Sequence, residues 1–155
     1  MKIEWKKLLV ALAIPLGVGG LAALLSGGMG DYRAMNQPPL SPPGWVFPVV
    51  WSALYLLMGY SSYLVWTSDA PNNQKRKALL FYAAQLLANF VWPLLFFGAK
   101  MYLTALVWLI LLWLLILLTI RAFEKIRELA GDLLIPYIVW VSFAVYLNFG
   151  IFLLN

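Results

Sequence analysis

Five long apolar runs, separated by short polar segments, dominate the sequence. Each run lacks charged residues, and together they cover residues 8–25, 45–66, 78–98, 102–120 and 133–154. A helix needs about 20 residues to cross a hydrocarbon core of about 30 Å, and each run is close to that length. Strands of a membrane barrel would alternate in polarity over about 10 residues, and these runs do not. The pattern predicts an all-α membrane protein, a single five-transmembrane-helix bundle over residues 1–155.

Composition narrows the chemistry that such a bundle can perform. Hydrophobic residues make up 64% of the chain and charged residues 11%, and both cysteine and histidine are absent. Thiolate chemistry and the commonest metal ligand are therefore excluded, and we expect neither a metal site nor a required cofactor. The spans carry none of the ionisable groups that ion-coupled transporters and pumps keep there. No hydrolytic triad or phosphate-binding loop is present either, which argues against conventional hydrolysis.

The basic residues are distributed unequally between the two ends of the predicted bundle. Nine of them fall on the side of the N-terminus, whereas Arg33 and Lys100 fall on the other side. By the positive-inside rule this predicts a cytoplasmic N-terminus and an external C-terminus, and it makes nucleic acid an unlikely explanation of the net charge of +5. The first run, with lysines before it, also fits a signal peptide. Its length and the lack of a cleavage motif favour a retained span.

The connection over residues 26–44 is the long one, and we predict that it lies outside the membrane. Glycines loosen its start and prolines stiffen its end: Gly27, Gly28, Gly30, Pro38, Pro39, Pro42 and Pro43. It could be a plain linker or a lid over a site between the helices, since long loops in compact folds are often binding loops. Its apolar residues, Tyr32, Met35 and Leu40, favour the lid.

Aromatic and amide side chains from three spans lie at similar depths. Counting about 1.5 Å per residue places Trp51 and Trp92 about 10 Å below the outer surface, and Asn89 near the middle. Trp140 falls slightly below the middle and Asn148 in the outer half. Helical spacing gives two coherent faces: Gln85, Asn89, Trp92 and Phe96 on the third span, and Trp140, Ala144, Leu147, Asn148 and Ile151 on the fifth.

Two interpretations of these side chains remain open at the level of sequence. Asn89 and Asn148 either contact a ligand or bridge helices by hydrogen bonds. Trp51 and Trp140 are too deep for an interfacial belt, so they either pack against neighbours or line a cavity. An apolar aromatic pocket with a few amides and hydroxyls would suit a flat, largely hydrophobic ligand.

Three segments resemble the signatures of the TspO/translocator protein family, also called tryptophan-rich sensory proteins or peripheral-type benzodiazepine receptors. They are PPLSPPGWVFPVVWSALYLLMGYSSYLVW (38–66), QLLANFVWPLLFFGAK (85–100) and PYIVWVSFAVYLNF (136–149). The resemblance spans all five runs. It implies a bacterial cell-membrane protein that binds porphyrins such as protoporphyrin IX and haem, as well as isoquinoline carboxamides and benzodiazepines. It also implies a link to tetrapyrrole stress and light-dependent porphyrin degradation, with tryptophans of the pocket implicated.

The resemblance and the depth argument together give the predicted site. The family pocket carries over to Phe47, Val50, Trp51, Trp92, Trp140, Ala144 and Leu147, and we expect Trp51 and Trp140 to act on the bound porphyrin. The whole predicted ligand site is Tyr32, Phe47, Val50, Trp51, Tyr55, Asn89, Trp92, Trp140, Phe143, Ala144, Leu147 and Asn148. The rival hypothesis is a sensor or carrier that binds a tetrapyrrole without transforming it. A third is a structural membrane partner with no ligand.

Two partner expectations follow from smaller motifs. Tyr146 is followed by LNFGIFLLN, which lacks the basic residue of the proposed cholesterol-recognition pattern, so the sequence argues against cholesterol as a partner. Ala84 and Ala88 form a small-xxx-small pair on the third span, which would allow close approach of two helices. This pair is compatible with a homodimer, and packing within one chain explains it as well.

Overall fold

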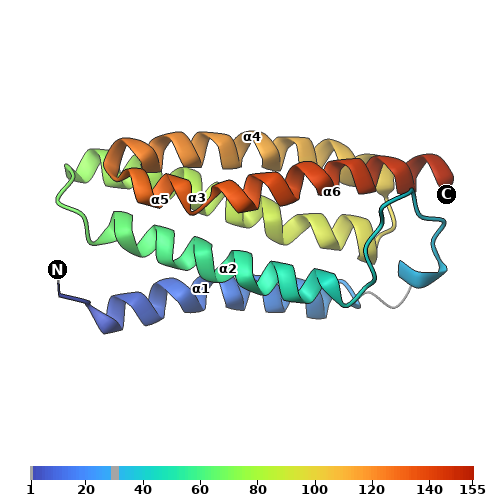
Figure 1. Ribbon diagram of the computed structural model, residues 1–155, viewed down its shortest axis with the longest axis horizontal. Helices are drawn as coiled ribbons and strands as arrows, with labels where there is room; N and C mark the ends of the chain where they lie inside the picture. Colours follow the sequence, from blue (N-terminus) through green and yellow to red (C-terminus); the bar gives the residue numbers. More distant parts are fainter. Residues whose placement is uncertain (1, 29–31) are drawn as a thin grey trace.

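In the computed structural model, which describes residues 2–28 and 32–155, the long helices run side by side along the long axis of the molecule (Figure 1). Five helical segments in this part of the chain are long and apolar enough to cross a membrane, and it contains no strand. The predicted fold class is therefore confirmed. In chain order the elements are α1 (Trp5–Leu25), η1 (Tyr32–Ala34), α2 (Val46–Trp66), α3 (Asn72–Pro93), η2 (Leu94–Gly98), α4 (Tyr102–Ile126), α5 (Glu128–Asp132) and α6 (Ile135–Leu154).

Two helices extend beyond the apolar runs that mark them. α3 begins at Asn72, six residues before the run 78–98, and α4 continues to Ile126, six residues past the run 102–120. The additional turns carry lysine and arginine, whose long side chains reach water while the backbone stays helical. The absence of charge therefore marks the length of helix immersed in lipid, and the helix itself ends further out.

Prolines shape the ends of the helices near the site. Pro48 and Pro136 lie in the first turns of α2 and α6, where a missing backbone N–H has no intrahelical partner to lose. Pro93 ends α3, and the chain continues as the π-helical turn η2. Because proline cannot donate to the carbonyl four residues earlier, the regular α-helical ladder is interrupted there. This interruption places Phe96 and Phe97 beside Trp92.

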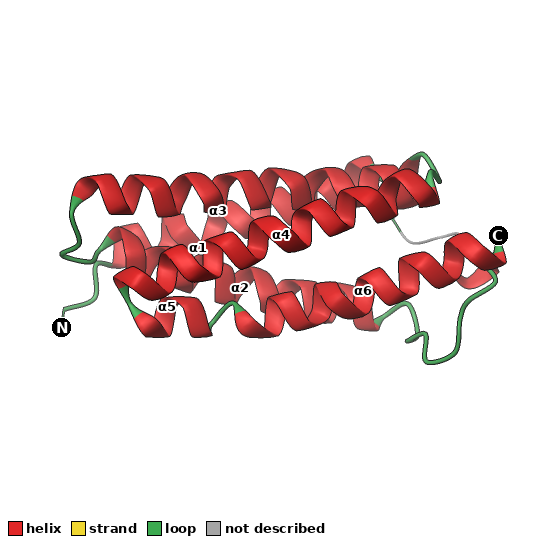
Figure 2. Cartoon of the chain, turned by 90° about the horizontal axis from the view of Figure 1, so that it is seen from above, coloured by secondary structure: helices red, strands yellow, loops and turns green. Residues whose placement is uncertain are grey.

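The helices pack as two groups, which the views in Figures 1 and 2 both display: α1 with α2, and α3 with α4 and α6. α1 is the least buried of the five spans. It approaches α2 closely at Gly59, where a Cβ atom would lie 2.7 Å from the Ala11 carbonyl oxygen and 2.8 Å from Leu12 Cα. α2 and α6 meet through aromatic side chains, with the rings of Phe47 and Trp140 5.8 Å apart.

The segment after η1 is attached to the C-terminal end of α6, over which it passes in Figure 1. Asn36 and Asn155 bond each other through backbone and side-chain groups. The Tyr146 hydroxyl donates to the Pro39 carbonyl at 2.6 Å, and the Pro38 ring lies against Gly150. These contacts hold the described part of the connection against the bundle. The termini lie at opposite ends of the molecule, as an odd number of spans requires.

Candidate ligand-binding site

A cavity of about 510 Å³ lies between α1, α2 and the C-terminal end of α3. Its described wall contains tyrosine and no other ionisable side chain, so the cavity offers shape, stacking and a few hydrogen bonds. The lining residues are Leu16, Gly19, Gly20, Ala22, Ala23, Ser26, Gly28, Gly44, Phe47, Pro48, Trp51, Ser52, Tyr55, Asn89, Trp92, Pro93 and Phe97.

The aromatic wall of the cavity comes from one face of α2. Phe47, Trp51 and Tyr55 are spaced four residues apart, so their side chains share that face. The Trp51 and Tyr55 rings are stacked, with centroids 5.6 Å apart and an interplanar angle of 28°. The edge of Trp51 also meets Tyr137 of α6, at 6.2 Å. Trp51 of α2 therefore packs against Tyr55 of the same helix and Tyr137 of α6, and it also lines the cavity.

Small residues of α1 form the opposite wall, and they were missing from the predicted site. The Tyr55 ring lies directly on Gly19, where a Cβ atom would overlap it. A Cβ at Gly20 would meet nothing within 4 Å, so this position opens onto free space in the cavity wall. The cluster Gly17, Gly19, Gly20, Ala22 and Ala23 in an otherwise bulky run was the available sequence signal. It indicates that space is left beside this helix.

A buried chain of hydrogen bonds forms the polar floor of the cavity. The Tyr55 hydroxyl donates to Asn89 Oδ1 at 3.0 Å, and Asn89 Nδ2 donates to the Tyr137 hydroxyl at 2.7 Å. Tyr137 in turn donates to Gln85 Oε1 at 2.7 Å. The chain joins α2, α3 and α6, so Asn89 does bridge helices, and it also lines the cavity. The helix-bridging role of Asn89 is thus observed, while its contact with a ligand stays a prediction.

Trp92 is fixed by a second set of polar contacts near the C-terminal end of α3. Its Nε1 donates to Asn148 Oδ1 at 3.1 Å, and Asn148 Nδ2 donates to the Tyr102 carbonyl at 2.9 Å. The Trp92 ring stacks on Phe96 at 5.1 Å. Asn148 therefore bridges α3, α4 and α6 and acts on the cavity by orienting Trp92. Its direct contact with a ligand is untested.

The predicted residues of α6 lie behind the aromatic wall. Trp140 meets the edge of Phe47 at 5.8 Å and Phe143 at 5.6 Å, and its Nε1 is buried without a hydrogen-bond partner among the described residues. Ala144 and Leu147 are buried in the bundle core. Five of the twelve predicted site residues line the cavity, and the other seven do not: Tyr32, Val50, Trp140, Phe143, Ala144, Leu147 and Asn148.

Tyr32 of the predicted lid is buried against the aromatic wall. Its ring is 2% exposed and meets the edge of Phe47 at 5.0 Å. Its hydroxyl donates to the Pro42 carbonyl at 2.8 Å, which holds η1 to the proline-rich segment. Gly44, also against Tyr32, lines the cavity. This part of the connection therefore packs against the cavity wall at the start of α2, and its role as a lid stays a prediction.

The small-residue pair on α3 is divided between two environments. Ala88 is buried, and its carbonyl accepts a hydrogen bond from Trp108 Nε1 of α4 at 2.8 Å. Ala84 is exposed. Packing within one chain accounts for Ala88, and a homodimer stays a prediction.

The fold and the cavity together define a class of protein. This is an integral membrane protein of five spans, with an aromatic-walled cavity between three of them. Such a cavity offers burial and stacking, and its described wall contains no carboxylate, amine or imidazole.

The chain belongs to the TspO/MBR family, whose sequence profile matches residues 11–154. It is 36% identical to the tryptophan-rich protein TspO of Chlorobaculum tepidum over 148 residues, 96% of this chain and 94% of that one. It is 37% identical to the tryptophan-rich sensory protein of Cereibacter sphaeroides, over 100% of this chain and 95% of that one. The translocator protein of Homo sapiens is 39% identical over 79% of this chain and 73% of its own length. The family resemblance predicted from the motifs is confirmed.

Proposed function

We propose that this protein binds porphyrins such as protoporphyrin IX in the cavity between α1, α2 and α3. The stacked pair of Trp51 and Tyr55 supports this most strongly, because it lines a largely apolar cavity with flat aromatic rings. A volume of about 510 Å³ lies within the range of small-molecule sites. Haem, isoquinoline carboxamides and benzodiazepines are further ligands of the same flat, lipophilic kind.

Binding through stacking would not require iron in the porphyrin. The chain contains neither histidine nor cysteine, so an iron porphyrin would lack the usual strong axial ligands. Asn89, the Tyr55 hydroxyl and the lining serines Ser26 and Ser52 are the polar side chains that would meet the propionates or the ring nitrogens. Haem and iron-free protoporphyrin IX are therefore expected to bind with similar affinity.

We further propose that illumination of the complex degrades the porphyrin, as part of a tetrapyrrole stress response. An excited porphyrin in contact with Trp51 would accept one electron and leave a tryptophan radical cation. Molecular oxygen would then take that electron from the porphyrin radical anion, giving superoxide beside the macrocycle. The protein would contribute by holding the porphyrin against the donor and limiting where the reactive oxygen attacks. Trp140, which touches the wall through Phe47, is the more remote donor.

Illumination of protoporphyrin IX with the purified protein in detergent tests this function. We expect faster bleaching than with an unrelated membrane protein, and a defined product. Trp51→Phe should reduce product formation nearly to that of free porphyrin, because phenylalanine keeps the wall but is a much poorer electron donor. Trp140→Phe should have a smaller effect. An unchanged product yield in the double variant would contradict the role of the tryptophans.

A sensor or carrier that binds the tetrapyrrole unchanged is the alternative function. The described cavity wall has Tyr55 as its one ionisable side chain, and this favours the alternative because binding needs no acid–base group. The name of the Cereibacter sphaeroides relative, a tryptophan-rich sensory protein, points the same way. Tight binding together with bleaching no faster than in control detergent would support this alternative.

We also propose that the protein resides in a bacterial cell membrane with its N-terminus in the cytoplasm. Nine basic residues belong to the segments at the N-terminal end of the bundle, and positive-inside orientation follows from that bias. The chain has no cysteine, so a single cysteine placed at Asn155 can be labelled selectively. Failure of a membrane-impermeant maleimide to reach it in intact cells would contradict this orientation.

A further inference from the structure

Two adjoining hollows lie on the surface of the bundle at its N-terminal end. One, of about 460 Å³, is bordered by both α3 and α4, and the other, of about 570 Å³, by α3. They share Asn73, Lys77 and Phe81. The first is completed by Gln74, Leu118, Arg121, Ala122, Lys125 and Ile126, and the second by Asn72, Arg76 and Leu80.

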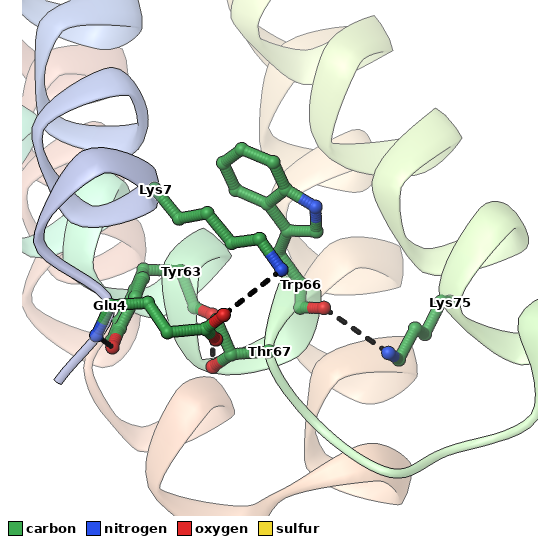
Figure 3. Close-up of polar contacts among 6 residues, drawn as sticks. All are labelled: Glu4, Lys7, Tyr63, Trp66, Thr67 and Lys75. Carbon is green, nitrogen blue, oxygen red and sulfur yellow. Dashed lines mark hydrogen bonds and ion pairs between the residues drawn. The ribbon is translucent and has the colours of Figure 1, made fainter. Parts of the chain in front are cut away.

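Four cationic side chains border these hollows without an ionic partner among the described residues. They are Arg76, Lys77, Arg121 and Lys125. Two nearby lysines, in contrast, contact other groups of the protein, as Figure 3 shows. Lys7 pairs with Glu4 at 3.2 Å and lies 5.5 Å from the centroid of the Trp66 ring, and Lys75 donates to the Trp66 carbonyl at 3.1 Å. Lys7 and Lys75 are thus engaged by groups beside α2, whereas the four cations that border the hollows have no ionic partner among the described residues.

The acidic residues of this end belong to other surfaces. Glu124 is adjacent to Lys125 in sequence, but its side chain lies against Gly131 of α5. Glu128 and Asp132 are on α5, and Asp69 precedes α3. Among the described residues, no acidic side chain lines either hollow. The surface between α3 and α4 is therefore open to an external anion.

An apolar surface continues from the hollows towards the middle of the bundle. Phe81 and Leu118 line them, and Leu118 is the last member of an exposed stripe on α4. The spacing of the stripe keeps it on one helical face: Val107, Leu111, Leu114 and Leu118, each 43–63% exposed. On α3, Leu80 and Leu87 are similarly exposed. Cations at the end of an exposed apolar stripe match a molecule with an anionic head and hydrocarbon chains.

We propose that this surface, formed by the two hollows and the α4 stripe, is a binding site for one anionic phospholipid. The phosphate would lie among Lys77, Arg121 and Lys125, where a guanidinium offers paired donors and the ammonium groups add charge. The acyl chains would follow the α4 stripe. Positive-inside orientation requires basic residues at this end, but not that they face a shared hollow on two adjacent helices. The clustering of these cations around one hollow is what indicates a lipid site.

The test compares two charge-matched double variants of the full-length chain. Lys77→Gln with Arg121→Gln removes two cations of the site, whereas Lys2→Gln with Lys6→Gln removes two exposed cations from the same end but outside it. Native mass spectrometry in neutral detergent, with phosphatidylglycerol and phosphatidylcholine as probes, measures retained lipid. We expect preferential retention of phosphatidylglycerol, a loss of at least about tenfold in the first variant, and little change in the second.

Several outcomes would overturn the proposal. Equal retention of the two lipids would show that the anionic head group is not recognised. Equal losses of phosphatidylglycerol in the two variants would show that the general positive charge of this end, and not this site, retains the lipid. Displacement of phosphatidylglycerol by inorganic phosphate at the same concentration would show that the apolar stripe contributes nothing. Cross-linking of two chains through cysteines placed at Leu118, with no lipid retained, would show that a second copy covers this face.

Discussion

Gly20→Phe is expected to weaken porphyrin binding about a hundredfold while leaving the fold intact. A Cβ atom at Gly20 meets nothing within 4 Å, so the new side chain has room at the cavity wall and enters the space that a ligand would use. A ring that displaces about 110 Å² of buried ligand surface removes about 2.8 kcal/mol, or about a hundredfold in affinity. Quenching of tryptophan fluorescence by protoporphyrin IX measures this directly.

Gly17→Phe is the matched control for this substitution. Gly17 is on the same helix, is equally free of neighbours within 4 Å, and does not line the cavity. The same increase in size should therefore leave the dissociation constant unchanged. An unchanged affinity in both variants would show that porphyrin binds elsewhere. Equal and large losses would point to a general effect on α1.

Gly59→Ala is expected to destabilise the bundle by about 1–3 kcal/mol, although alanine is the better helix former. The added Cβ would lie 2.7 Å from the Ala11 carbonyl oxygen and 2.8 Å from Leu12 Cα. Both are backbone atoms, so α1 and α2 must move apart to accommodate one methyl group. Unfolding in detergent by increasing SDS, followed by circular dichroism, gives the change in midpoint.

The control for this second prediction is Gly17→Ala. That methyl group meets nothing within 4 Å, so helix propensity should act alone and stability should be unchanged or slightly higher. A Gly59 variant as stable as the Gly17 variant would mean that the close approach of α1 and α2 contributes little to folding.

The fold was predictable because the length of each apolar run determines it. In a hydrocarbon solvent the backbone must satisfy its own hydrogen bonds, so an apolar run of about 20 residues is nearly always a helix. The ends of α3 and α4 were less predictable, because the charged side chains that end the apolar run do not end the helix. The short helix α5 lies between two such ends, where hydropathy carries little information.

The cavity was only partly predictable from the same signals. Depth along each span placed Trp51 and Trp92 at a similar level and Asn89 nearer the middle, and all three line the cavity. Depth does not tell which way a helix faces, however, and Trp140 lies behind Phe47. The sequence did not indicate that α1 lines the cavity, because glycine and alanine have no functional groups in their side chains. Its contribution is the space that they leave, and only the packing of α1 on α2 reveals this.

The most direct test of this account is a structure of the protein with protoporphyrin IX bound. We predict that the macrocycle lies between α1, α2 and α3, with one face towards the Trp51 ring and an edge near Asn89. Small residues of α1 should contact the opposite face. A macrocycle bound instead on the α6 side of Phe47, against Trp140 and Ala144 with the α1 cavity empty, would contradict the account.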